Sequence, residues 1–188
     1  MLEVEIKFTA PDFAVLEERL KQARAEESEP EHDEEDTYFN APDRDFSKTD
    51  EALRMRCTGE ASLVTYKGPK VDAKTKTRAE IDVALASGEE PAENFARLLL
   101  RLGYKPAGVV RKTRKAFRLE SGGLPVTVCL DTVQELGRFA ELEIKVPESQ
   151  LETARNTILD LAGKWGLKDS ERRSYLELLL SKEASSSK

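Results

Sequence analysis

The chain has 188 residues, of which 39% are hydrophobic and 35% are charged, and its formal net charge is −6. This length is typical of one domain with a sizeable core, and the negative charge argues against a general nucleic-acid-coating protein. No apolar run approaches the ~20 residues that span a bilayer, and the acids at positions 3 and 5 do not fit a signal peptide. We therefore expect neither nucleic acid nor a membrane as a partner.

The first expected element is a strand over residues 3–8, in which charged and apolar side chains alternate. Successive side chains of a strand point to opposite faces, so Glu3, Glu5 and Lys7 share one face and the apolar residues between them share the other. The same alternation recurs in three later segments, at Arg54 and Arg56, at Glu80 and Asp82, and at Glu141, Glu143 and Lys145. We therefore hypothesise that several strands pool their charged faces into one enclosed interior.

The remaining elements follow from hydrophobic periodicity and from turn residues. A helix is expected from about residue 12 to 25, and the acidic stretch Glu26–Asp36 is interpreted as a solvated loop. Further strands are expected at 37–39, 51–58, 61–67, 77–85, 107–119, 124–130 and 138–146, and helices at 91–102, 149–165 and 173–180. We expect one domain over residues 1–180 and a disordered tail over 181–188.

These elements predict an α+β fold. Each helix has one apolar stripe, and the apolar face of the strands is the partner available to bury it, so the helices would cover the outside of the sheet. About eight antiparallel strands can close into a barrel that is wide enough for interior side chains or a small ligand, and closure also removes unpaired edges. We therefore predict an eight-stranded antiparallel closed β-barrel with helices packed outside.

The inventory of reactive side chains excludes several chemistries. The chain has one histidine, His32, so histidine triads and histidine-rich zinc sites have little to work with. It contains neither GxxxxGKS/T nor GxGxxG, so phosphate would have to be bound by side chains. The two cysteines, Cys57 and Cys129, lie in separate expected strands and indicate buried free thiols in the cytoplasm.

The expected inner face carries charges of both signs. Such a surface suits a polyanion that is held by Arg and Lys and bridged by divalent cations to carboxylates. Oxygen ligands without His or Cys favour Mg²⁺ or Mn²⁺ over Zn²⁺, and they support phosphoryl or nucleotidyl transfer. The alternative is a two-sided sheet in which these charges, Arg54 and Arg56 among them, form cross-strand salt bridges. The acids are Glu3, Glu5, Glu80, Asp82, Asp131, Glu141 and Glu143, and the bases are Lys7, Arg54, Arg56, Lys67, Lys112, Arg114 and Lys145.

Several short motifs occur in a fixed order along the chain. Glu3-x-Glu5-x-Lys7 is an ExExK sequence, and after it come Arg54-x-Arg56, Lys67 before Gly68-Pro69, Glu80, Lys112-x-Arg114, Asp131, Glu141-x-Glu143 and Arg172-Arg173-Ser174-Tyr175-Leu176. This ordered set, from residue 3 to about residue 180, resembles the CYTH superfamily, the triphosphate tunnel metalloenzymes. Within that superfamily it is most similar to the class IV adenylyl cyclase-like (CyaB-type) subgroup. The resemblance implies an eight-stranded antiparallel tunnel, in agreement with the strand pattern.

The resemblance also implies roles for these side chains. The triphosphate would be held by Lys7, Arg54, Arg56, Lys67, Lys112 and Arg114, with Arg173 as a lid contact. One or two Mg²⁺ or Mn²⁺ ions would be held by Glu3, Glu5, Asp131, Glu141 and Glu143, and Glu80 would support the basic row. The catalytic set would be Glu3, Glu5, Lys7, Glu141 and Glu143.

Three functions fit this resemblance. We favour a hydrolase, in which metal-bound water attacks a terminal phosphorus of tripolyphosphate, thiamine triphosphate or a nucleotide. The alternative is a lyase that converts ATP to cyclic AMP and pyrophosphate, and a further alternative is a polyphosphate-binding module without turnover. The expected partner is a small-molecule triphosphate in each case, and the sequence leaves a homodimer open.

Overall fold

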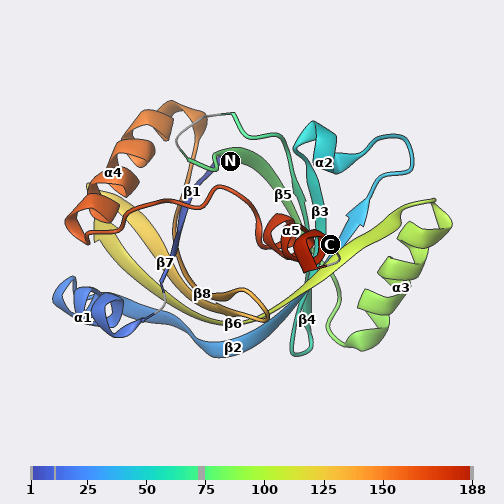
Figure 1. Cartoon of the computed structure of the whole chain (residues 1–188), viewed down its shortest axis with the longest axis horizontal. Helices are drawn as coiled ribbons and strands as arrows, with labels where there is room; N and C mark the ends of the chain where they lie inside the picture. Colours follow the sequence, from blue (N-terminus) through green and yellow to red (C-terminus); the bar gives the residue numbers. More distant parts are fainter. Residues whose placement is uncertain (1, 11, 72–74, 187–188) are drawn as a thin grey trace.

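The computed structural model describes residues 2–10, 12–71 and 75–186. Within these ranges eight strands form a closed barrel in the order β1-β5-β4-β3-β2-β6-β7-β8, and neighbouring strands are antiparallel (Figure 1). The predicted fold class is therefore confirmed. The strands are β1 (Leu2–Thr9), β2 (Glu26–Asn40), β3 (Ala52–Thr58), β4 (Ala61–Lys67), β5 (Arg78–Ala84), β6 (Lys105–Ser121), β7 (Leu124–Val133) and β8 (Gly137–Val146).

Strand β1 closes the barrel between two strands from distant parts of the sequence. It pairs with β8 along its whole length, starting with Leu2 opposite Val146. Its register with β5 covers Leu2 opposite Ala79 and Glu3 opposite Arg78. The charged face of β1 thereby becomes part of a continuous inner wall, while its apolar face joins the outer core.

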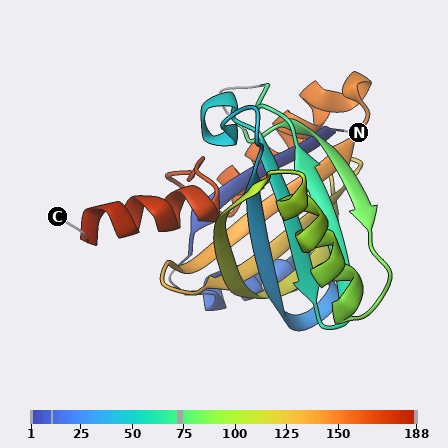
Figure 2. The ribbon, with the colours of Figure 1, turned by 90° about the vertical axis from the view of Figure 1, so that its right-hand side faces the viewer.

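Three helices cover the outside of the barrel: α1 (Ala14–Gln22), α3 (Glu89–Arg101) and α4 (Leu151–Lys164). Helices α1 and α4 bury their apolar stripes against β1, β6, β7 and β8 in the largest core cluster. Helix α3 packs across β2, β3 and β4 (Figure 2). Two short helical segments, α2 (Phe46–Thr49) and η1 (Glu148–Gln150), precede β3 and α4. The apolar faces of most strands are thus covered from outside, as the pattern predicts, whereas Ile81 and Val83 of β5 are 61% and 54% exposed.

Helix α5 (Tyr175–Ser186) closes one end of the barrel instead of covering its outer wall. It projects outward from that end (Figure 2). Its buried residues Tyr175 and Leu179 pack against Val110 and Phe139. Side chains two residues apart in a strand share a face. Val110 therefore shares the inward face of β6 with Lys112, and Phe139 shares that of β8 with Glu141. One end of the barrel interior is therefore apolar and filled by α5.

The acidic residues 26–36 form most of β2, so the expected solvated loop is wrong. This strand pairs with β6, which supplies the compensating positive charge. Arg111 donates to Glu35 at 2.8 Å, and the Lys115 ammonium lies 3.3 Å from Glu27. A charge run that would be solvated in isolation is stabilised here by cross-strand ion pairs.

The expected disordered tail is also wrong for the residues that the structure describes. Helix α5 continues through Ser181 to Ser186, and residues 187 and 188 lie outside the described part. The Ser181 hydroxyl donates to the carbonyl of Glu177 at 2.6 Å, and the Lys182 ammonium donates to the carbonyl of Glu135. No glycine or proline interrupts this segment, so the helix has no local reason to end earlier.

Both cysteines are free thiols. Cys129 is buried, as expected, whereas Cys57 is half-buried. Among the helices of the described ranges, none has the length and apolar character needed to cross a membrane.

The packing of α5 predicts unequal effects for two adjacent leucines. Leu179 is 9% exposed and Leu180 is 45% exposed. We expect Leu179→Ala to lower the free energy of unfolding by about 2 kcal/mol, because it leaves a cavity in the barrel end. Leu180→Ala, the matched control, should change it by less than about 0.5 kcal/mol. Urea denaturation measures both, and equal effects would contradict the packing of α5 inside the barrel end.

Candidate active site

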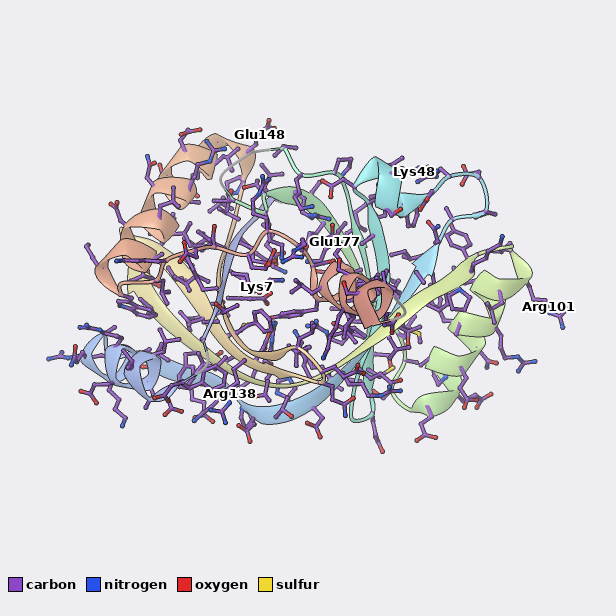
Figure 3. The ribbon with its side chains drawn as sticks, in the orientation of Figure 1. Lys7, Lys48, Arg101, Arg138, Glu148 and Glu177 are labelled. Carbon is purple, nitrogen blue, oxygen red and sulfur yellow. The ribbon has the colours of Figure 1, made fainter. Side chains whose placement is uncertain are left out.

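A cavity of about 410 Å³ lies inside the barrel. Lys7 lies near the middle of the ring of strands, whereas Lys48 and Arg101 lie at the periphery (Figure 3). The hypothesis of one enclosed, charged interior is confirmed, because residues from most of the chain line this cavity. The expected residues among its lining are Glu3, Glu5, Lys7, Arg54, Arg56, Lys67, Glu80, Asp82, Lys112, Arg114, Glu141, Glu143 and Lys145.

Two residues that the resemblance assigned to the site do not line this cavity. Asp131 is fully buried and accepts two hydrogen bonds from Arg114, at 2.7 and 2.6 Å. Its carboxylate is therefore engaged in orienting a base and is not presented to a metal. The Arg173 side chain is exposed and pairs with Glu171 at 2.5 Å. What Arg173 contributes to the interior is its carbonyl oxygen, which accepts a hydrogen bond from Lys7 at 2.6 Å.

The barrel interior also contains charged residues that we did not predict. Asp36, Lys76 and Arg78 line the cavity, and Glu34 is buried beside Lys112 at 3.1 Å. Glu34 and Asp36 are two residues apart, but the acidic residues on either side of them mask the alternation in the sequence. Lys76 and Arg78 extend the alternation of Glu80 and Asp82 toward the start of β5, but the expected strand begins at residue 77, so Lys76 falls outside it.

The two neighbouring arginines of β3 have different surroundings. Arg56 donates to both carboxylate oxygens of Asp36, at 2.6 and 2.8 Å, and lies 3.1 Å from Glu34. Arg54 is held more loosely, by Thr65 at 3.3 Å and by Asp36 at 3.7 Å. The Nε of Arg54 is buried without a hydrogen-bond partner among the described residues. Arg54 is therefore the more loosely paired of the two arginines, whereas Arg56 is bound directly by a carboxylate.

The ammonium of Lys7 is buried at the centre of the site. Burial and the nearby Lys76 ammonium lower the pKa of Lys7 to about 7, against the opposing effect of Glu141. Glu141 Oε1 lies 3.9 Å from Lys7, and Glu141 is bound more closely by Arg114, at 2.6 Å. An anion in the cavity would favour the charged form of Lys7.

The carboxylates of β1, β5 and β8 form a strongly coupled group. Burial raises the pKa of Glu143 to about 8, and the Glu3 and Glu141 carboxylates contribute to that rise. Burial and a hydrogen bond with Glu3 raise the pKa of Glu80 to about 7. Burial also opposes the ionisation of Glu3, but the Lys67 ammonium at 3.1 Å, a hydrogen bond with Glu80 and the Lys145 ammonium together outweigh it and hold the pKa of Glu3 below its usual range. The surroundings of Glu143 therefore favour its protonated form.

This arrangement fits a divalent cation that arrives with its substrate. No three acidic, His or Cys side chains of the described ranges already form a metal-ligand cluster. Mg²⁺, however, is commonly held by one or two carboxylates, with waters and substrate phosphates completing its shell. Glu143 lies beside Glu3, Glu5 and Glu141, and a bound cation would stabilise the charged form of its carboxylate. The donor set therefore fits Mg²⁺ or Mn²⁺ bound together with a triphosphate.

Known proteins resemble the chain along almost its whole length. The model of the CYTH domain matches residues 1–175. A putative adenylate cyclase of Methanocaldococcus jannaschii is 35% identical over 181 residues, which cover 95% of this chain and 98% of that protein. The adenylate cyclase CyaB of Aeromonas hydrophila is 28% identical, and the match covers 94% of this chain and 87% of that protein. A Pyrococcus horikoshii protein of solved structure is 39% identical with a TM-score of 0.83, covering 96% of this chain and 99% of that chain.

The surroundings of Arg54 and Arg56 predict that replacing Arg56 mainly lowers stability, whereas replacing Arg54 mainly weakens triphosphate binding. Arg56→Ala should lower the free energy of unfolding by about 3 kcal/mol, because it removes the two hydrogen bonds to the buried Asp36 carboxylate and one ion pair of the buried Glu34. Arg54→Ala should change the free energy of unfolding by less than about 1 kcal/mol and should reduce the rise in melting temperature that tripolyphosphate produces. Melting curves with and without tripolyphosphate measure both effects. The reverse ranking in unliganded stability would refute this assignment.

The raised pKa of Glu143 predicts a pH-dependent effect of Glu143→Gln. Between its usual 4.5 and about 8, the folded protein holds a proton that the unfolded chain has released. The stability of the wild type therefore falls as pH rises through this window. The glutamine variant lacks this titration, so it should gain stability relative to wild type from about pH 5 to about pH 9. Melting temperatures across this range test the effect, and a difference that is constant with pH would contradict it.

Proposed function

The chain belongs to the CYTH family, and from this premise we propose that it is a divalent-metal-dependent enzyme that hydrolyses a phosphoanhydride bond of a triphosphate bound in the barrel. The substrates that fit are tripolyphosphate, thiamine triphosphate and nucleoside triphosphates. One observation carries the proposal: basic side chains, with Arg54 only loosely paired, and carboxylates whose ionisation is disfavoured line the same enclosed cavity. A triphosphate with a cation would satisfy both.

The bases would bind and orient the phosphates. Arg54 has an unpartnered Nε, and Lys7 and Lys67 reach the cavity from neighbouring parts of the wall. Arg56, Lys112 and Arg114 are held by buried carboxylates, so their positions are fixed before a ligand arrives. Fixed donors cost little reorganisation when charge develops on the phosphate oxygens, which is how such sites stabilise the transition state.

The carboxylates of β1 and β8 would hold the cation. Glu143 is the first candidate ligand, with Glu141, Glu3 and Glu5 beside it. When bound, Mg²⁺ or Mn²⁺ would neutralise charge on the phosphate oxygens and supply an activated water. Burial within the barrel would strengthen each of these electrostatic interactions by excluding bulk water.

An adenylyl cyclase is the second candidate, and the names of the two curated relatives favour it. In that reaction the 3′-hydroxyl of ATP attacks the α-phosphorus, the α–β anhydride bond breaks, and cyclic AMP and pyrophosphate leave. The same bases and cation would serve both reactions. Product identification separates them, since hydrolysis releases orthophosphate or a shorter phosphate chain and forms no cyclic nucleotide.

The proposal predicts strict dependence on a divalent cation and on β1. Chelation should abolish turnover of a triphosphate panel, and Mg²⁺ or Mn²⁺ should restore it. Glu5→Gln keeps the shape of the side chain and removes its charge, so it should lower kcat by about 10²–10³-fold. Glu27→Gln is the matched control, because Glu27 lies on the exposed outer face of β2 and pairs with Lys115.

Initial rates and chromatographic product analysis measure these effects. Full activity of Glu5→Gln would remove the role of β1, and binding of tripolyphosphate without any turnover would indicate a non-catalytic module.

A further inference from the structure

Lys7 is held in the cavity mainly by neutral groups. Its ammonium donates to the carbonyl of Arg173 at 2.6 Å. It also lies 4.0 Å from the centre of the Tyr175 ring. The carboxylate of Glu141, at 3.9 Å, is beyond ordinary hydrogen-bond distance. By contrast, Arg114 is bound directly by the carboxylate of Asp131.

The ring of Tyr175 is itself fixed in place. Its hydroxyl donates to Asp131 at 2.9 Å, and its ring makes an edge-to-face contact with Phe139 at 5.1 Å between centroids. Tyr175 is 6% exposed, at the start of helix α5. A ring that is anchored at both its edge and its hydroxyl presents one constant face to Lys7.

Lys112 approaches the same ring, at 5.3 Å, but it depends on the ring less. Its ammonium lies 3.1 Å from Glu34 and 3.3 Å from Asp131. These two carboxylates suffice to hold it. Of these two lysines, Lys7 is therefore the one whose position depends on the Tyr175 ring.

We propose that Tyr175 is a positioning residue for the triphosphate: its ring face, together with the Arg173 carbonyl, aims the Lys7 ammonium into the cavity without neutralising it. A carboxylate in this place would attract the ammonium strongly and compete with an incoming phosphate. An aromatic face attracts a cation more weakly, through its quadrupole, and leaves the net charge for the ligand. This inference rests on the proposed function, because it takes a triphosphate as the ligand.

The first test is the affinity for tripolyphosphate, measured by calorimetry in a buffer with a chelator so that turnover does not interfere. Tyr175→Phe keeps the ring and should bind within about threefold of wild type. Tyr175→Leu removes the ring and should bind about tenfold more weakly. In both variants Asp131 keeps its bonds from Arg114, so its buried carboxylate is not left unpaired.

The second test asks whether Tyr175 acts through Lys7. In a Lys7→Met background, Tyr175→Leu should weaken binding by less than about threefold more, because the cation that the ring positions is gone. In an Arg54→Met background, the control, Tyr175→Leu should still cause about a tenfold loss. Arg54 contacts Thr65 and Asp36, so its effect should be independent of Tyr175.

The outcomes separate this inference from the proposed function. A tenfold loss from Tyr175→Leu in the Lys7→Met background would overturn it, and so would an equal loss in Tyr175→Phe. If wild type binds tripolyphosphate and the coupling holds but no substrate is turned over, the proposed hydrolysis fails and the positioning role stands. If wild type binds tripolyphosphate neither with the chelator nor with Mg²⁺ or Mn²⁺, both fail. Melting curves establish that each variant is folded, and Tyr175→Met replaces Tyr175→Leu if the latter is not.

Discussion

Charged groups that are enclosed in a barrel must be compensated there, and this constraint organises the whole molecule. Strand alternation turns every second residue inward, and taking an unpaired charge out of water costs several kcal/mol or more. The inner wall meets this cost with cross-strand pairs, among them Arg56 with Asp36, Arg114 with Asp131, and Lys76 with Glu5. The opposite faces of most of these strands are apolar and pack against the covering helices. Fold and site are thus two consequences of one pattern.

Compensation of the inner wall is incomplete at residues of both signs, among them Arg54 and Glu143. Arg54 carries a buried donor that the described residues do not satisfy. Glu143 lies in a carboxylate group that resists its ionisation. A fully paired interior would be more stable without a ligand. The incomplete pairing of Arg54 and Glu143 is therefore typical of a site that binds an anion and a cation together. The pairing of the other charges keeps these two residues in place.

The sequence predicts the barrel and most of its interior because both depend on a period of two residues. Glu3, Glu5 and Lys7 show this period without ambiguity, as do Glu141 and Glu143. It fails for Glu34 and Asp36, where both faces of the strand are acidic and alternation between polar and apolar residues disappears. The pairing partners could not be predicted either. Whether Arg56 awaits a phosphate or binds Asp36 depends on which strands are neighbours, and this is a property of the closed barrel.

The position of β1 between β8 and β5 has a consequence for the biosynthesis of the protein. Glu3, Glu5 and Lys7 leave the ribosome long before β8 does, yet β8 is the strand that pairs with β1 along its full length, and it ends at Val146. Contacts between such distant segments form slowly, because the loop between them must be closed first. The nascent N-terminal strand therefore has an unpaired edge until most of the protein has been synthesised. The charged residues of this strand reduce the risk that it pairs with other chains during that interval.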